Sequence, residues 1–305
     1  MILLAAFENT FDMNKISLMM IAAIGLIAAG CSSNSKKPKM TSEMGEDDIN
    51  ESLEKAKQVF YALPSPVETA YLIQTTGVPY NVDLANPVEN ASNYTTTLQK
   101  ALNFGVYGAD LSYVGLFNQT QTSIRYMATA KQMADELGIL EFVKNDIVER
   151  VEANINNRDS LMDILTEGFV SSSDYLKETG RAEVAALIAA GGWIEGLYLS
   201  TSLADFAADN TKLKDLVVDQ RLSLSILLKL LDNFKSNPNV AKVYEWLVDL
   251  QDTYNDVKTV ATELSAEVTA DGKTTIGSGE RPTVNDVVFE SICHKVDSIR
   301  SLIVD

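Results

Sequence analysis

Two acidic residues, Asp110 and Glu195, stand in stretches of the sequence that are otherwise apolar and rich in glycine. Asp110 lies in Leu102–Tyr126, and Glu195 lies in Ala189–Leu203. An ionised carboxylate buried among apolar residues is expensive unless a partner compensates its charge, so we expect each acid to have one. A carboxyl group in such a setting can bind a ligand or exchange protons, or it can fix the register of a packed core.

The side chains expected around the two acids leave both interpretations open. A polar pocket between the two helices would bind a small ligand, whereas a satisfied buried network would be structural, and the structural interpretation is favoured. The residues of the predicted ligand pocket are Tyr107, Asp110, Tyr113, Trp193, Glu195 and Tyr198. The candidate partners for the two charges are Arg125, Arg181, Tyr107, Tyr113 and Tyr198.

Glycine is concentrated in the same two stretches. Each glycine inside a helix costs about 1 kcal/mol relative to alanine, so a cluster of them needs a reason. We expect the two helices to pack small face against small face, with their backbones in close approach. The glycines concerned are Gly105, Gly108, Gly115, Gly191, Gly192 and Gly196.

Other catalytic chemistry finds little support in the sequence. The single histidine, His294, follows Cys293, and neighbouring residues on a helix point about 100° apart, so the two do not form a dyad. Cys293 is expected to be an inert thiol in a helical core. Nucleophile elbows, phosphate loops, dinucleotide fingerprints and calcium loops are missing, and one histidine disfavours zinc. The sequence therefore predicts a protein that is not an enzyme and needs no metal or cofactor.

Apolar residues recur at three- and four-residue spacing through most of the chain after Asn50, which is typical of amphipathic helices. The predicted fold is all-α, an irregular multi-helix antiparallel bundle formed by one domain, 51–305. One exception is Val268–Ile276, where strand-forming residues flank Asp271-Gly272 and indicate a short β-hairpin or a mobile flap. The helices are expected over 51–63, 67–76, 88–117, 120–137, 140–156, 159–179, 181–208, 211–236, 239–266 and 285–304.

The first predicted helix is amphipathic. Pro64 ends it, and Pro66 suits the first turn of the next helix. The apolar positions at helical spacing are Leu53, Ala56, Val59, Phe60 and Leu63.

The stretch Leu26–Cys31 ends the apolar run Ile16–Gly30, which is too short to cross a bilayer but suits the core of a signal peptide. It resembles the lipobox of bacterial lipoproteins, in which a signal peptidase cuts before an acylated cysteine. The family usually carries leucine where this chain has Ala28. The resemblance implies that Cys31 is lipidated and anchors the chain to a membrane. The alternative is an ordinary secretory signal with a chance cysteine.

The same resemblance divides the chain into a signal peptide, 1–30, and a flexible anchored tether, 31–50, before the helical domain. Met13 is the expected true start, because Glu8 and Asp12 do not fit a positive leader. Ser32 after the cysteine implies export to the outer membrane, and Ser32–Lys39, which is neutral and then basic instead of acidic, favours its periplasmic face. Gly105–Tyr113 resembles a segment of helical lipoproteins from Bacteroides-like bacteria, and no known activity comes with that resemblance.

The chain is acidic, with a formal net charge of −17, of which −16 remains after residues 1–30. Nucleic acid and anionic lipid surfaces would repel such a protein, so neither is expected as a broad partner. The preferred function is non-catalytic interaction or scaffolding with a protein partner in the cell envelope. The alternatives are a ligand-binding lipoprotein and, less favoured, a carboxylate-based hydrolase.

Overall fold

The computed structural model describes residues 63–140, 145–206, 211–261, 265–268, 274–277 and 280–305. The chain falls into two units, Met1–Met44 and Gly45–Asp305, and every described residue belongs to the second. The predicted signal peptide, Cys31, the tether and the helix predicted before Leu63 lie outside the described residues.

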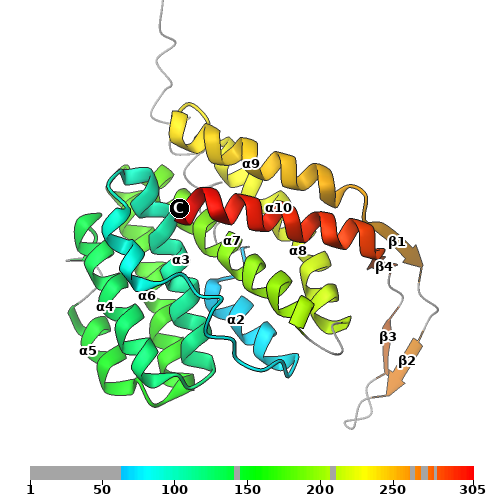
Figure 1. Ribbon diagram of the computed structural model, residues 1–305, viewed down its shortest axis with the longest axis horizontal. Helices are drawn as coiled ribbons and strands as arrows, with labels where there is room; N and C mark the ends of the chain where they lie inside the picture. Colours follow the sequence, from blue (N-terminus) through cyan, green and yellow to red (C-terminus); the bar gives the residue numbers. More distant parts are fainter. Residues whose placement is uncertain (1–62, 141–144, 207–210, 262–264, 269–273, 278–279) are drawn as a thin grey trace, which may run out of the picture. The chain divides into compact units, whose positions relative to one another are not determined.

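The second unit is an all-α multi-helix bundle, as predicted (Figure 1). Its described part holds nine α-helices and one 3₁₀-helix, and most boundaries agree with the sequence-based ones within a few residues. The elements are α2 Pro66–Thr75, η1 Val88–Asn93, α3 Thr97–Leu116, α4 Thr120–Glu136, α5 Asn145–Asn154, α6 Arg158–Glu178, α7 Ala182–Phe206, α8 Thr211–Asp232, α9 Pro238–Tyr254 and α10 Asp286–Val304.

The single helix predicted over 88–117 is wrong in its first part. Val88–Asn93 forms the 3₁₀-helix η1, Tyr94 is extended, and α3 begins only at Thr97. The reason is a capping box at Thr96, whose side chain accepts a hydrogen bond from the Gln99 amide while the Gln99 side chain accepts one from the Thr96 amide. This cap fixes a new helix start and separates η1 from α3.

The helix predicted over 239–266 is wrong after Tyr254, where α9 ends in a turn. The hairpin predicted over Val268–Ile276 is confirmed in part, because β2 (Ser265–Val268) pairs antiparallel with β3 (Thr274–Gly277). Its Asp271-Gly272 turn lies outside the described residues. An unpredicted ladder flanks it, in which β1 (Lys258–Ala261) pairs with β4 (Glu280–Thr283). Segments of strand-forming residues thus pair with each other instead of extending α9.

Helices α3 and α7 form the centre of the bundle. Between them they contact α2, α4, α6, α8, α9 and α10. Almost every residue from Ala101 to Leu116 is buried, which is the pattern of a helix covered on all sides. By length and composition α7 is apolar enough to cross a bilayer, but 89% of its most apolar window is buried inside the bundle, which is the position of a core helix.

Glycine brings α3 and α7 into backbone contact, as the sequence predicts. A Cβ atom placed on Gly105 would lie 2.1 Å from the Ile188 carbonyl oxygen and 2.6 Å from the Gly192 nitrogen. A Cβ on Gly191 would lie 2.0 Å from the Leu102 oxygen. Side chains cannot fit at these positions unless the helices move apart.

We expect Gly105→Ala to lower the free energy of unfolding by about 1–3 kcal/mol, because the added methyl group meets backbone that cannot yield locally. Gly168→Ala in α6 is the matched control, since its Cβ would meet Ile147 at an ordinary 3.5 Å. There the higher helix propensity of alanine should leave stability unchanged or raise it by up to about 1 kcal/mol. Urea denaturation measures both, and equal effects would contradict close packing at Gly105.

Candidate functional site

The two acids predicted to form a polar centre do meet, and they meet a third charge that the sequence analysis missed. Asp110 on α3 and Glu195 on α7 are both fully buried. The guanidinium group of Arg300 on α10 donates from Nε to Glu195 Oε2 at 3.2 Å and from Nη2 to Glu195 Oε1 at 3.3 Å. Two parallel bonds of this kind orient the pair as well as neutralise it.

Arg300 is held by more than the carboxylate. Its Nη2 also donates to the Leu84 carbonyl oxygen at 3.4 Å, and the guanidinium carbon lies 4.4 Å from the centre of the Tyr198 ring. Such stacking on an aromatic ring is favourable for a desolvated arginine. Tyr198 therefore belongs to the predicted polar centre, as a ring beneath the cation.

Asp110 has a different environment from Glu195. Its Oδ2 accepts a hydrogen bond from the Asn86 amide at 3.1 Å, while Oδ1 has no donor among the described residues. Burial, and then the charge of Glu195, raise the pKa of Asp110 well above its usual range, against the opposing effect of Arg300. The raised pKa favours the protonated form of Asp110, which can act as a hydrogen-bond donor to the Glu195 carboxylate.

Glu195 also has a raised pKa because it is buried, but Arg300 and the hydrogen bond from Asp110 both act to lower it. With Asp110 protonated, the centre contains one carboxylate, one protonated carboxyl group and one guanidinium group. In that state it is electrically neutral, so no charge is buried without compensation.

The tyrosines use their hydroxyl groups to hold the connection between α2 and α3. Tyr107 donates to the Pro87 carbonyl oxygen at 2.9 Å, and Tyr113 accepts from the Asn81 amide at 2.9 Å. Two tyrosines outside the predicted set act similarly: Tyr126 donates to the Asn86 carbonyl oxygen and Tyr94 donates to the carbonyl oxygen of Val304. Burial raises the pKa of all four phenols, that of Tyr113 to about 12.

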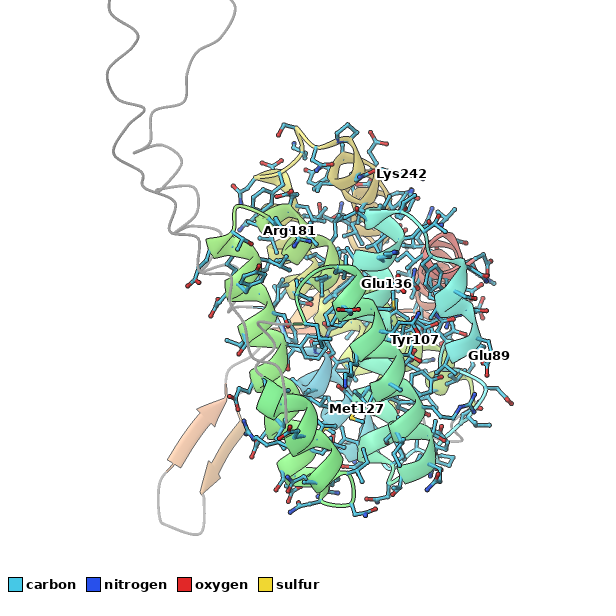
Figure 2. The ribbon with its side chains drawn as sticks, turned by 90° about the vertical axis from the view of Figure 1, so that its left-hand side faces the viewer. Glu89, Tyr107, Met127, Glu136, Arg181 and Lys242 are labelled. Carbon is cyan, nitrogen blue, oxygen red and sulfur yellow. The ribbon has the colours of Figure 1, made fainter. Side chains whose placement is uncertain are left out.

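The arginines predicted as charge partners lie elsewhere. Arg125 forms an exposed ion pair with Glu89, and Arg181 donates to the Leu137 carbonyl oxygen. Figure 2 shows Arg181 well away from Tyr107. Arg300 was missed, although its position holds a signal: Val296, Ile299 and Ile303 at helical spacing predict a buried face, and Arg300 falls beside it.

Trp193 forms its hydrogen bond with a residue other than Asp110 and Glu195. Its indole Nε1 donates to the Ser223 hydroxyl at 2.9 Å, and the ring lines a groove of about 280 Å³ between α6 and α7, the α6–α7 groove.

Asn103, which was not predicted, joins the polar centre to the chain end, because its Nδ2 donates to the Ile303 carbonyl oxygen at 2.8 Å.

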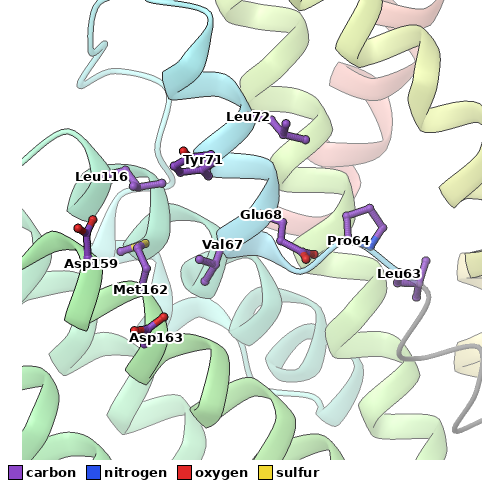
Figure 3. Close-up of a pocket in the computed structure, with 10 residues that line it drawn as sticks. All are labelled: Leu63, Pro64, Val67, Glu68, Tyr71, Leu72, Leu116, Asp159, Met162 and Asp163. Carbon is purple, nitrogen blue, oxygen red and sulfur yellow. The ribbon is translucent and has the colours of Figure 1, made fainter. Parts of the chain in front are cut away.

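A larger hollow, the α2–α6 groove, lies on the surface beside α2 (Figure 3). Its volume is about 670 Å³, its walls are mostly apolar, and three carboxylates lie along it. Sequence reasoning did not find it, because its walls come from three separate segments. The residues that line it are Leu63, Pro64, Val67, Glu68, Tyr71, Leu72, Leu116, Asp159, Met162 and Asp163.

Metal and thiol chemistry gain no support from the geometry. Within the described ranges, no group of three or more histidine, cysteine or acidic residues is arranged to hold a metal ion. Cys293 is partly buried rather than fully in the core, and burial raises the pKa of its thiol to about 12. That thiol is protonated at neutral pH and is a poor nucleophile.

Comparison with protein families, curated proteins and solved structures finds no match to this chain. The roles of its residues therefore rest on the geometry given above.

We expect Asp110→Asn to be at least as stable as the wild type at pH 7, because the amide resembles the protonated carboxyl group. The raised pKa of Asp110 means that the folded protein binds this proton more tightly, so wild-type stability falls as pH rises from about 4 toward the raised value. The Asp110→Asn variant should lack this pH dependence of the free energy of unfolding, whose slope is at most about 1.4 kcal/mol per pH unit.

Denaturation of Asp110→Asn between pH 4 and pH 8 measures this pH dependence, with Asp297→Asn as a control at an exposed carboxylate. A marked loss of stability at pH 7 in Asp110→Asn, with the pH dependence unchanged, would mean that Asp110 is ionised.

Proposed function

We propose that this protein is a lipid-anchored protein of the bacterial cell envelope with a non-catalytic interaction or scaffolding role. The observation that carries the proposal is the stretch Leu26–Cys31, with its small residues before the cysteine and a signal-like apolar run before them. Acylated Cys31 anchors the chain, and the acidic helical body faces the periplasm from the outer membrane. A protein of the envelope is the expected partner.

The polar centre supports a role without catalysis. Asp110 and Glu195 have no exposed surface, and Arg300 donates a hydrogen bond to each of the two carboxylate oxygens of Glu195. A hydrolase would need two carboxyl groups in a cleft that substrate and water can enter. A buried neutral network instead fixes how α3, α7 and α10 pack.

The packing also weighs against the alternative of a small-ligand pocket between the glycine-rich helices. A ligand there would need space where a single methyl group on Gly105 would already lie 2.1 Å from a carbonyl oxygen. Tyr107 and Tyr113, which would line it, hold the backbone of the α2–α3 connection instead. We therefore keep the interaction role as the proposal.

Cys31→Ser tests the anchor. In cells fed an alkyne-bearing fatty acid, the wild type should carry the label and partition into the detergent phase, because a multiply acylated terminus binds membranes stably. Cys31→Ser should lose both properties, whereas Cys293→Ser should retain them. Label on Cys31→Ser, or an unlabelled wild type in the aqueous phase, would refute lipidation at this residue.

The interaction role is tested separately by cross-linking in intact cells. The anchored wild type should form an adduct of defined mass. A protein that is fully labelled with lipid but remains monomeric and without adducts would contradict the interaction role while leaving the anchor in place.

A further inference from the structure

The α2–α6 groove is an apolar surface at the point where the described chain begins. Leu63 and Pro64 form one end of it, and Asp159, Met162 and Asp163 lie toward the other (Figure 3). Along it, Tyr71 and Leu72 leave 52% and 42% of their surface exposed. A contiguous apolar surface on a protein commonly marks a place where something binds.

The segment directly before the groove has an apolar face that needs burial. Glu51–Ala62 leads into Leu63, and its residues Leu53, Ala56, Val59 and Phe60 fall within about 120° of a helix at 100° per residue, with Tyr61 and Ala62 outside that arc. An amphipathic helix gains stability only when that face packs against another element. As a helix the twelve residues would be about 18 Å long.

Covalent connection favours this segment over any free partner. Leu63 ends the predicted helix and lines both this groove and the α6–α7 groove, so no intervening loop has to be ordered when the helix meets either of them. The entropic cost of bringing ends together is smallest for the shortest connections. Binding within one chain also proceeds at a high effective concentration.

The predicted helix and the α2–α6 groove carry opposite charges. On the predicted helix, Lys55 and Lys57 flank the apolar face, one on each side, about 100° from its centre. Of the three carboxylates in the groove, Glu68 accepts a hydrogen bond from the Ser65 amide and Asp159 pairs with Arg158. Asp163 is exposed and forms no ion pair with another residue of the described ranges, so it is open to a lysine.

We propose that Glu51–Ala62 docks into the α2–α6 groove of its own chain as a helical strap. Its apolar face covers Tyr71, Leu72 and Met162, and its lysines lie toward Asp159 and Asp163. Docking there sets where the preceding chain leaves the helical body. Release would add twelve residues to the tether, which is up to about 40 Å of reach, and would uncover the groove. This proposal does not depend on lipidation.

Hydrogen exchange of the full chain in detergent micelles, followed by mass spectrometry, tests the strap. The amides of 53–62 should be protected in the wild type. Phe60→Asp should reduce this protection at least about tenfold, since burying a phenylalanine is worth more than 1.4 kcal/mol. Gln58→Asp, on the opposite face, is the matched control and should change it by less than about twofold. Unchanged protection of α3 shows that each variant is folded.

Three variants on the body locate the docking site. Tyr71→Lys, in the α2–α6 groove, should expose 53–62, because it removes an apolar ring and repels the lysines. Val170→Lys, at a similarly exposed residue of the α6–α7 groove, should not. Asp163→Lys should weaken protection by about two- to fivefold.

Three results would overturn the proposal. The first is rapid exchange of 53–62 in the wild type, and the second is release by Val170→Lys but not by Tyr71→Lys. The third is protection that disappears when the protein is diluted, because a second copy would then be filling the groove.

Discussion

The close approach of α3 and α7 is the constraint on which the rest of the bundle depends. Glycine at 105, 191 and 192 lets the two backbones touch, and no side chain fits between them. Helices this close leave little room for water, so any polar group that they carry must find its partner inside the protein. The arrangement of the polar centre follows from that exclusion of water.

Two carboxyl groups enter this dry region, and one cation is supplied by a third helix. Arg300 approaches from α10 and binds Glu195, while burial favours the protonated form of Asp110, which accepts a hydrogen bond from the Asn86 backbone amide. The same contacts bring together segments distant in sequence, since Arg300 also binds Leu84 and Asn103 binds Ile303. The network thus joins the C-terminal helix and the α2–α3 connection to the central pair. Because these contacts hold the helices together, a ligand could not enter the polar centre without breaking them.

Much of the fold follows from the sequence because it depends on local rules. Apolar spacing predicts the helices, and glycine clusters predict where two of them touch. The partners of buried charges are harder to predict from the sequence. The apolar surroundings of Asp110 and Glu195 show that each needs a partner. Nothing local in the sequence selects Arg300, 105 residues beyond Glu195, over Arg125 or Arg181. The α2–α6 groove was missed for the same reason, since three segments build it. The capping box at Thr96 is a local signal, and it was overlooked within a longer periodic pattern.

The central claim is that the buried charges are a structural lock, and the stability of Arg300→Met tests it most directly. Removing the cation leaves a buried carboxylate without compensation, so the free energy of unfolding should fall by about 3–5 kcal/mol at pH 7. Arg125→Met, which breaks the exposed pair with Glu89, should change it by no more than about 1 kcal/mol. If Arg300→Met were as mild as Arg125→Met, the charges would not hold the bundle together and the account would be wrong.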